Sequence, residues 1–567
     1  MKAGPRFRIT PQLFLVGLAA GVIAYLTLIP LAMLVYGSLK SGPPGVSGDL
    51  TVKNYLALFS DWRLAGALLN SVIFSAGSSL LAFTGGLYLA WITERTNVPW
   101  RGAIYTCILV PMIVPGILTT VGWIMLFGRR SGVVNIIATQ YLGFDQPIEI
   151  NNMPGMIWVQ GTDDIPLVFL LLAAALRSMD PSLEEAAMVA GSGIVRTTLR
   201  ITVQVLLPAI LAVWMISFVR AIESFEVPAL IGIPAGILVF ATEVYLATKS
   251  VPTDFGVAST FAVVYLVITT IGVVLYLRWT AASEQFATIT GKGFRPTAFD
   301  LGRWRTSLAI LNLLLCFVLF ILPVLTVVWS SFLPFYMAPS KAALASLTLE
   351  NYQNLWNLPL VHRALWNSFV LGISSSTITM LLTAIVAWII VRTSWRGKGM
   401  LDFLAFSPIA MPGLVLGIAI LWLYLVLPLP VYGTLWILLI AYVTKYLPYG
   451  MRACSSSMLQ IKKELEEASE TSGASWSHTF RRVILPLLAP GFVAGWIYVI
   501  THSFRELSTS IMLYRSGTEV ISIVLFELWD GGQYPQLSAL GMVLITILVV
   551  ISLIARAIGG RYSIQQI

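Results

Sequence analysis

The sequence predicts an all-α membrane protein with about twelve transmembrane helices, arranged as two homologous six-helix units. Three observations support this prediction. The 567-residue chain is 57% hydrophobic and only 11% charged, uncharged apolar runs recur along it, and its second half repeats the first. Soluble proteins carry about a quarter charged residues, so an ordinary soluble enzyme is excluded. The net charge of +9 is explained by basic loops that orient membrane helices, and nucleic acid is not an expected partner.

Each span is predicted from a run of about 20 apolar residues, the length that crosses the hydrocarbon core as a helix. The first run is long and interrupted by proline, so we interpret it as a retained helix rather than a cleaved signal peptide. The predicted spans are 12–37, 65–92, 103–127, 157–177, 205–231, 256–277, 307–331, 364–391, 402–427, 432–456, 485–512 and 537–557.

The lysines and arginines predict the orientation of these spans. Most of them fall in alternate connecting segments, and loops rich in Lys and Arg remain in the cytoplasm. We therefore expect a multi-pass membrane protein whose N- and C-termini are both cytoplasmic.

The internal repeat predicts the domain organisation. Asn70, Trp91 and Arg95 have identical partners 297 residues later, whereas a polar loop near 178–204 recurs 282 residues later. The change in offset leaves 15 extra residues in the first half, and we place them in an external stretch around 129–152. The sequence predicts a first unit over 1–280, a basic cytoplasmic linker over 281–305, and a second unit over 306–567 with its own loop near 458–484.

The repeated loop has the pattern of a short helix, a turn and a second helix. Acidic residues favour a helix N-terminus, a glycine six residues beyond the second glutamate interrupts the helix, and a basic segment follows. The loop residues are Glu184, Glu185, Ala186, Gly191 and Arg200 in the first copy, and Glu466, Glu467, Ala468, Gly473, Arg482 and Pro486 in the second.

This spacing resembles the inner-membrane permeases of binding-protein-dependent ABC importers, whose cytoplasmic loop combines Glu-Ala, a glycine six residues beyond the glutamate, and Leu-Pro. The second copy ends in Leu485-Pro486, whereas the first has Val203-Gln204 there. The resemblance implies a type I importer fold, in which one chain supplies both permease halves. It also implies a place in the bacterial inner (plasma) membrane, two cytoplasmic ATPase subunits that receive the loops, and an external solute-binding protein.

In the resembled family the loop couples ATP hydrolysis to transport. On that reading Glu185 and Glu467 hold the loop by charge-assisted hydrogen bonds, while Gly191 and Gly473 permit the turn. An amphipathic loop lying on the headgroups of the lipid bilayer is the alternative. It explains the loop arginines, but not a duplicated Glu-Ala pair followed at a fixed distance by glycine.

The chain contains no phosphate loop of the type GxxxxGK[ST]. We therefore expect a transport subunit that is not an enzyme, has no cofactor of its own, and depends on partner subunits to bind ATP. Its three cysteines and three histidines lack metal-ligand spacing.

Ionisable residues within the predicted spans are candidates for a translocation path, because a charge in hydrocarbon is costly unless it faces a polar interior. Asp163 is equivalent to Lys445, and Glu223 to Arg505, so opposite charges can pair across a pseudo-two-fold axis. Interfacial snorkelling, or a local pair of Arg220 with Glu223, is the alternative. The candidates are Asp163, Arg220, Glu223, Glu226, Lys445, His502, Arg505 and Glu506.

The solute is predicted from two short runs. Residues 220–232 and 505–514 look like those of the ferric-iron branch of the resembled permeases, which implies ferric iron. The same importer class also serves thiamine, polyamines, phosphonates and other anions, and these alternatives remain open. An ATP-independent secondary transporter also has about twelve spans and is the alternative from another class.

Overall fold

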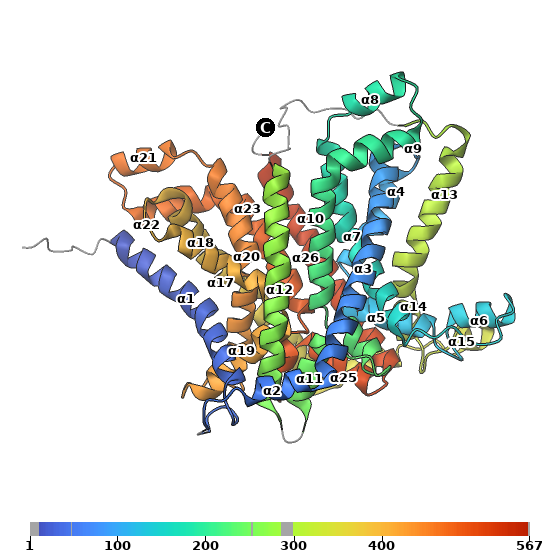
Figure 1. Ribbon diagram of the computed structural model, residues 1–567, viewed down its shortest axis with the longest axis horizontal. Helices are drawn as coiled ribbons and strands as arrows, with labels where there is room; N and C mark the ends of the chain where they lie inside the picture. The colour runs from blue at the N-terminus through green and yellow to red at the C-terminus, as the bar shows by residue number, and fades with distance from the viewer. Residues whose placement is uncertain (1–10, 47, 251–252, 285–298, 565–567) are drawn as a thin grey trace, which may run out of the picture.

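The computed structural model describes residues 11–46, 48–250, 253–284 and 299–564, which form a bundle of long helices (Figure 1). Outside helices, the extended pairing in these residues is limited to two isolated bridges, Lys40 with Leu50 and Thr96 with Phe299. Residues 285–298 of the predicted linker lie outside the described residues. We refer to 11–284 as the first half and to 299–564 as the second half.

The elements of the two halves follow one another in corresponding order. The first half contains α1 (Pro11–Ser38), α2 (Lys53–Ser60), α3 (Trp62–Arg95), α4 (Arg101–Leu109), η1 (Val110–Met112), α5 (Gly116–Leu126), α6 (Val133–Gln140), α7 (Met153–Ser178), α8 (Ser182–Val189), α9 (Ile194–Thr197), η2 (Thr198–Thr202), α10 (Val203–Glu223), η3 (Pro228–Gly232), α11 (Phe240–Lys249) and α12 (Phe255–Glu284). The second contains η4 (Gly302–Trp304), α13 (Arg305–Cys316), η5 (Phe317–Ile321), α14 (Leu322–Ser331), α15 (Lys341–Ala345), α16 (Glu350–Trp356), α17 (Pro359–Arg392), α18 (Lys398–Phe406), η6 (Ser407–Ala410), α19 (Gly413–Val426), α20 (Leu435–Gln460), α21 (Glu464–Thr471), α22 (Trp476–Thr479), η7 (Phe480–Ile484), α23 (Leu485–Arg505), α24 (Ser510–Leu513), α25 (Ile521–Asp530) and α26 (Tyr534–Ile564).

The helix lengths reproduce the sequence repeat. Helices α3 and α17 both have 34 residues, α7 and α20 both have 26, and α10 and α23 both have 21. Helix α6 lies in the stretch where the first half has its extra residues. It sits at the end of the bundle opposite to α8 and α9 (Figure 1).

Nine helices of the described residues are long and apolar enough to cross a membrane, and up to eleven spans result if two bent helix pairs count as one each. The predicted span 432–456 forms helix α20 but is not among them. Polar residues dilute its apolar content, among them Lys445, Arg452 and the run Ser455–Ser457. The predicted spans 205–231 and 485–512 correspond to helices that end earlier, at Glu223 and Arg505, and the apolar segments beyond them form the separate short helices η3 and α24, which are buried in protein.

Small residues bring the long helices of the first half close together. Gly85 and Gly86 of α3 face Ile165 and Val168 of α7, at sites where an added Cβ would collide with these side chains. Between membrane helices, close packing of this kind replaces the hydrophobic driving force that water supplies. In the second half, Gly450 of α20 faces Thr383 of α17 in the same way.

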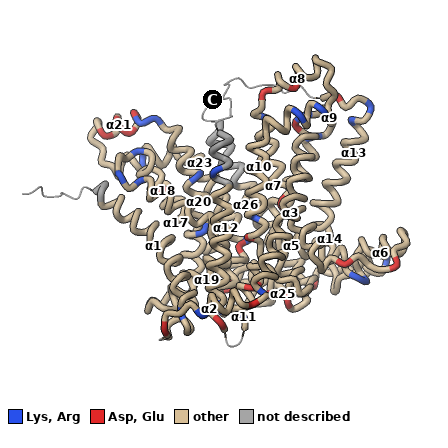
Figure 2. Tube along the Cα trace, in the orientation of Figure 1, with Lys and Arg blue, Asp and Glu red and all other residues tan. Residues whose placement is uncertain are grey.

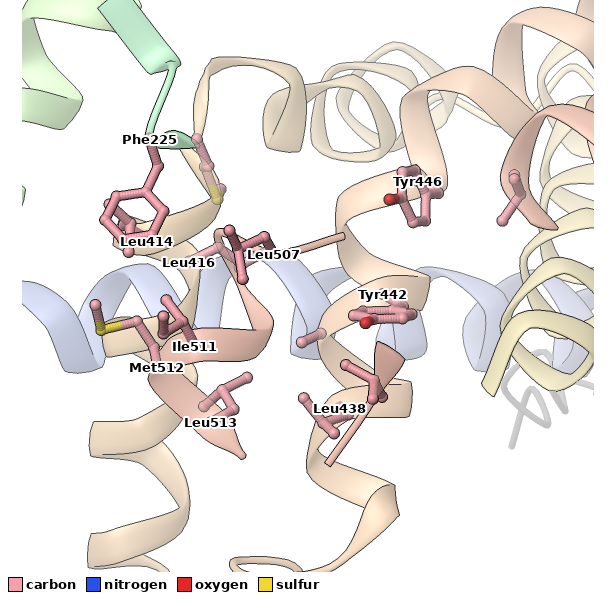
Figure 3. Packing of buried hydrophobic residues seen from close by; sticks show 14 of the residues in the cluster. Phe225, Leu414, Leu416, Leu438, Tyr442, Tyr446, Leu507, Ile511, Met512 and Leu513 are labelled. Atoms are coloured by element: carbon pink, nitrogen blue, oxygen red, sulfur yellow. The ribbon is translucent and has the colours of Figure 1, made fainter. Parts of the chain in front are cut away.

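The two halves interlock through their first helices. Helix α1 packs against α19 of the second half, and α14 packs against α5 of the first. Tyr25 of α1 and Tyr424 of α19 share a hydrogen bond of 2.8 Å, and the Trp422 indole donates to Ser259 of α12 at 2.6 Å. Figure 3 shows the apolar core between the halves, where Phe225 lies beside Leu414.

Two membrane-length elements are broken at equivalent places. The pair from Arg101 to Leu126 bends by 103° between Met112 and Gly116, and the pair from Lys398 to Val426 bends by 112° just before Gly413. A proline precedes each restart, and proline cannot donate the hydrogen bond that would continue a helix. Each break therefore leaves a free helix end inside the bundle.

Candidate functional site: two anchored loops and a charged cavity

The repeated loops form helix pairs α8–α9 and α21–α22, which lie at the same end of the molecule (Figure 1). Figure 2 shows that charged residues concentrate at the two ends of the bundle and that a small group of both signs lies inside it. The loops and this internal group are the two parts of the candidate site.

The first loop is anchored by Glu184. Its carboxylate is buried, accepts a hydrogen bond from the Thr202 hydroxyl, and lies 3.4 Å from the buried guanidinium of Arg95 at the C-terminal end of α3. The indole of Trp91 on the same helix donates to Thr198 at 3.2 Å. These contacts tie the loop to α3.

The second loop is anchored in the same way by Glu466. Its carboxylate accepts hydrogen bonds from the Arg392 guanidinium at 2.6 Å and from the Trp388 indole at 3.1 Å. Both donors belong to α17 and are equivalent to Arg95 and Trp91 of α3. The Arg392 guanidinium also donates to the carbonyl of Met458 at the end of α20.

We expected the second glutamate of each pair, Glu185 and Glu467, to hold the loop. In the structure, the first glutamate of each pair forms the contacts described above. Glu467 is exposed and pairs with Lys463 one helical turn away at 3.0 Å. The hydrogen bond from that pair raises the pKa of Lys463. Glu185 is half-buried beside its anchored neighbour. Glu184 and Glu466 occupy equivalent positions and meet the equivalent arginines of α3 and α17.

Each loop turns at its predicted glycine. Gly191 and Gly473 have φ of +85° and +83°, the left-handed region in which glycine is favoured. Gly473 donates to the Glu470 carbonyl at 2.9 Å and Ala474 to the Ser469 carbonyl at 3.1 Å, and the first loop has the same bonds. This is a Schellman motif, which ends a helix by satisfying its last carbonyl groups.

The remaining predicted loop residues lie on the loop surface. Ala186, Ala468, Arg200 and Arg482 are exposed, and Pro486 lies in the first turn of α23. Arg95 and Arg392 were not predicted to contact the loops, although their identical positions in the two halves are the sequence signal that marks them.

The internal group surrounds one cavity, and all eight candidate path residues line it. Its empty volume is about 1040 Å³, including the space at its open mouth. The aromatic side chains Tyr446, Tyr449 and Tyr498 line the same cavity. Tyr449 stacks on Tyr498, and Tyr498 stacks on His502 with ring centroids 3.9 Å apart.

The ion pairs in and beside the cavity form within each half rather than across the axis. Arg220 lies 3.2 Å from buried Asp164, not beside Glu223 as the local alternative expected. Lys445 contacts both carboxylate oxygens of Glu506 at 2.6 Å instead of pairing with Asp163. The equivalent positions meet around the cavity, but the closest opposite charge comes from a neighbouring helix of the same half.

Arg505 joins the halves by a different contact. Its guanidinium donates to the carbonyl of Met112 at 2.7 Å, at the broken end of η1 in the other half. Glu226 places a carboxylate oxygen against Gly116, where α5 restarts. A cation at a free C-terminal end and an anion at a free N-terminal end both complement the helix dipole.

Asp163 completes this arrangement. The Thr119 hydroxyl, in the first turn of α5, donates to the Asp163 carboxylate at 3.2 Å. In the second half the restart of α19 at Gly413 faces the Lys445 ammonium group, which would lie 2.8 Å from an added Cβ. In the described residues, no three His, Cys, Asp or Glu side chains are grouped so as to hold a metal ion.

Comparison with known proteins gives consistent matches. Residues 379–563 match the family described as binding-protein-dependent transport system inner membrane component. A ferric transport system permease protein of Actinobacillus pleuropneumoniae is 26% identical over 504 residues, which cover 88% of this chain and 72% of the relative. A putative ferric transport system permease protein of Haemophilus influenzae is 27% identical over 528 residues, 92% and 80% of the two chains.

A solved bacterial ABC transporter that imports alginate also matches. The match has a TM-score of 0.37 and 15% identity, and covers 45% of this chain and 94% of the other.

Proposed function

We propose that the chain is the permease of an ATP-driven importer, because residues 379–563 match the family described as binding-protein-dependent transport system inner membrane component. One polypeptide supplies both halves of the translocation path, and the imported solute is ferric iron. The observation that carries this proposal is the pair of equivalent, buried-glutamate-anchored loops at one end of a bundle whose interior holds a charged cavity.

The loops transmit movement from two ATPase subunits, which bind the ATP. Glu466 fixes the second loop to the end of α17, and α17 packs along α20 and α23, which carry Lys445 and His502. Glu184 fixes the first loop to α3, which packs along α7 and hence beside Asp163. A displacement of either loop is therefore passed to a wall of the cavity through packed helices.

The charges of the cavity favour a cationic solute. Two of its carboxylates, Glu506 and the adjoining Asp164, are engaged by Lys445 and Arg220. Three others, Asp163, Glu223 and Glu226, have no ion-pair partner within 4 Å among the described residues, and Arg505 is the cation of the cavity that likewise has none, so unpaired carboxylates outnumber unpaired cations. Carboxylate oxygens suit hard cations, and the relatives named above are ferric transport permeases. Thiamine and polyamines are cations that the same charges admit, whereas phosphonates and other anions fit them less well.

The orientation follows from the loops. The end that carries α8 and α21 faces the cytoplasm together with both chain termini, and the opposite end receives an external solute-binding protein. Helix α6 lies at that opposite end (Figure 1) and contributes to the docking face.

Reconstitution tests the function directly. The purified chain and its ATPase subunits are placed in vesicles, with iron-loaded binding protein on one side and ATP on the other, and radioactive ferric iron is followed. We expect accumulation that requires both ATP and the binding protein. Accumulation by the chain alone in ATPase-free vesicles would instead show a secondary transporter. Parallel binding of thiamine, a polyamine and a phosphonate to the same binding protein decides between the solutes.

A further inference from the structure

The start of the second half is fastened to the first half beside the first loop. Phe299 forms an isolated parallel bridge with Thr96, the residue that follows α3. The Phe299 backbone amide donates to the Arg95 carbonyl at 2.8 Å, and its carbonyl accepts a hydrogen bond from the Asn97 backbone amide at 3.1 Å. Phe299 therefore lies on the end of α3 from which the first loop is held.

The Phe299 side chain packs beside a residue that contacts the loop. It is only 1% exposed, and its ring lies against Trp91, with ring centroids 6.3 Å apart. Trp91 is the residue whose indole donates to Thr198 of the first loop. One side chain of the second half thus covers the indole that binds the first loop.

Side-chain hydrogen bonds hold residues 299–301 in place, and we call this segment the clasp. The Asn97 side-chain amide donates to the Asp300 carboxylate at 2.6 Å, and its carbonyl oxygen accepts from the Leu301 backbone at 3.0 Å. Asp300 also accepts from the Gly302 backbone at 2.9 Å, where η4 begins. The clasp leads through η4 into α13, which packs on α4 of the first half.

The second loop obtains the corresponding aromatic contact from its own residues. Trp388, equivalent to Trp91, packs against Trp476 of the second loop, with ring centroids 5.1 Å apart. The first loop has Ile194 at the position equivalent to Trp476. The aromatic partner of the α3 tryptophan therefore comes from the other half, whereas that of the α17 tryptophan comes from the loop that it binds.

The ion pairs of the two loops differ in the same sense. Arg392 lies 2.6 Å from Glu466 and also donates to two backbone carbonyls at the end of α20. Arg95 lies 3.4 Å from Glu184, and two of its buried nitrogen atoms have no hydrogen-bond partner among the described residues. Short charge-assisted hydrogen bonds are the strong ones, so the ion pair of the first loop constrains its loop less by itself.

We propose that Phe299 is a positioning residue for the first loop, and that the clasp fixes this loop relative to α13 of the second half. For its effect on transport, this inference rests on the proposed function. Without the Phe299 ring the Trp91 indole loses its apolar cover, and Thr198 loses a fixed donor. The second loop stays in place, because the contact of its tryptophan is internal.

Spin labels on the two loops of the full chain test the clasp. After replacement of the native cysteines, a label is attached at Val189→Cys or at Thr471→Cys, which are exposed, equivalent positions of the two loops. We expect Phe299→Ala to raise the mobility of the label at residue 189 only. Trp476→Ala, the matched change, should raise that at residue 471 only. Phe299→Leu, which keeps an apolar side chain, should retain most of the order.

The hydrogen bond between Asn97 and Asp300 allows a test with rescue. Asn97→Asp sets two carboxylates against each other, and is expected to mobilise the label at residue 189 and to lower ATP-dependent uptake. Adding Asp300→Asn restores a pair of one amide and one carboxylate in the reverse direction, and should restore both properties. A double variant that is no better than Asn97→Asp would overturn the role of the clasp.

Uptake by the complex with the ATPase subunits is measured on the same variants. We expect Phe299→Ala to lower it at least about tenfold, because truncation of a buried Phe shifts an equilibrium by well over a factor of ten. Equal changes in mobility at the two labels, or none at residue 189, would overturn the inference. The labels report without ATP or solute. A mobile first loop with unchanged uptake would therefore support the clasp and contradict the proposed function.

Discussion

Individual buried charges decide which residues hold the loops. Glu466 and Arg392 are each about nine-tenths buried and 2.6 Å apart, whereas the Glu467 carboxylate is 56% exposed. Removing one partner of a buried ion pair leaves the other charge without compensation, which is far more costly than losing a surface pair. The two adjacent glutamates therefore carry unequal weight.

We predict that Glu466→Gln and Glu467→Gln have opposite outcomes. Loss of the buried charge is expected to lower the free energy of unfolding by about 3 kcal/mol and to abolish coupled transport, while Glu467→Gln changes both little. Thermal unfolding of the purified protein and ATP-dependent uptake in vesicles measure the two effects. A larger loss from Glu467→Gln would show that the anchor is the second glutamate after all.

The turn glycines give a second prediction at this scale. Because Gly473 has a φ of +83° with no atom within 4 Å of an added Cβ, the cost of substitution lies in the backbone alone. Gly473→Val is expected to abolish uptake while the protein stays in the membrane. Gly473→Asn, which tolerates the left-handed region better, retains a substantial part of it. Immunoblots measure the amount of protein in the membrane, and transport assays measure uptake. Equal losses of uptake in the two variants would contradict a conformational role for Gly473.

At the scale of elements, the broken helices place polar groups in the interior. Arg505 and Glu226 lie at the two helix ends created by the break between Met112 and Gly116. A continuous helix would satisfy its own backbone there and leave no site for either side chain. The break therefore positions both charges beside the cavity.

We predict that Gly116→Ala disrupts this arrangement. The added methyl group meets the Glu226 carboxylate, and overpacking of this kind costs about 1–3 kcal/mol. Uptake should fall by about tenfold or more, whereas Gly102→Ala, with nothing within 4 Å, should be neutral. In the Gly116→Ala background, Glu226→Ala should restore thermal stability but not uptake. Recovery of both would show that Glu226 has no part in transport.

The sequence predicted the elements better than the partners of their side chains. The glycine spacing located both loop turns, whereas 103–127 was predicted as one span and the break between Met112 and Gly116 was missed. The pairing of Arg220 with Asp164 depends on how α7 and α10 pack, which no local pattern records. The same holds for Glu466, because helical periodicity places it beside Glu467 and only the position of α17 distinguishes the two. The apolar residues beyond the end of α10 are buried in protein, and in the sequence they look like the continuation of a membrane span.

At the scale of the whole molecule, the two halves are interlocked and enclose the cavity jointly. Helices α1 and α14 each pack on the opposite half, and the cavity is lined from both. Movement of one half against the other must therefore change the size or the exposure of the cavity.

We predict that cysteines distinguish the cavity from the adjacent core. Ser508 lines the cavity, whereas Ser510, two residues later, is fully buried and bonded to Tyr442. After replacement of the three native cysteines, Ser508→Cys should react with a small polar thiol reagent at least about tenfold faster than Ser510→Cys. The rate at Ser508→Cys should also change with nucleotide. Equal, nucleotide-independent rates at the two positions would exclude an aqueous path at this cavity.

One chain supplies both walls of the cavity, so the two walls can differ in sequence. The walls of a cavity between identical subunits cannot. Across an axis of true symmetry, each residue confronts its own copy, so an aspartate would repel an aspartate and a lysine a lysine. Here Asp163 and Lys445 occupy equivalent positions in the two halves, yet their side chains carry opposite charges. Three of the four carboxylates that line the cavity come from the first half, whereas its three tyrosines come from the second, an asymmetry that two identical halves related by a two-fold axis could not have.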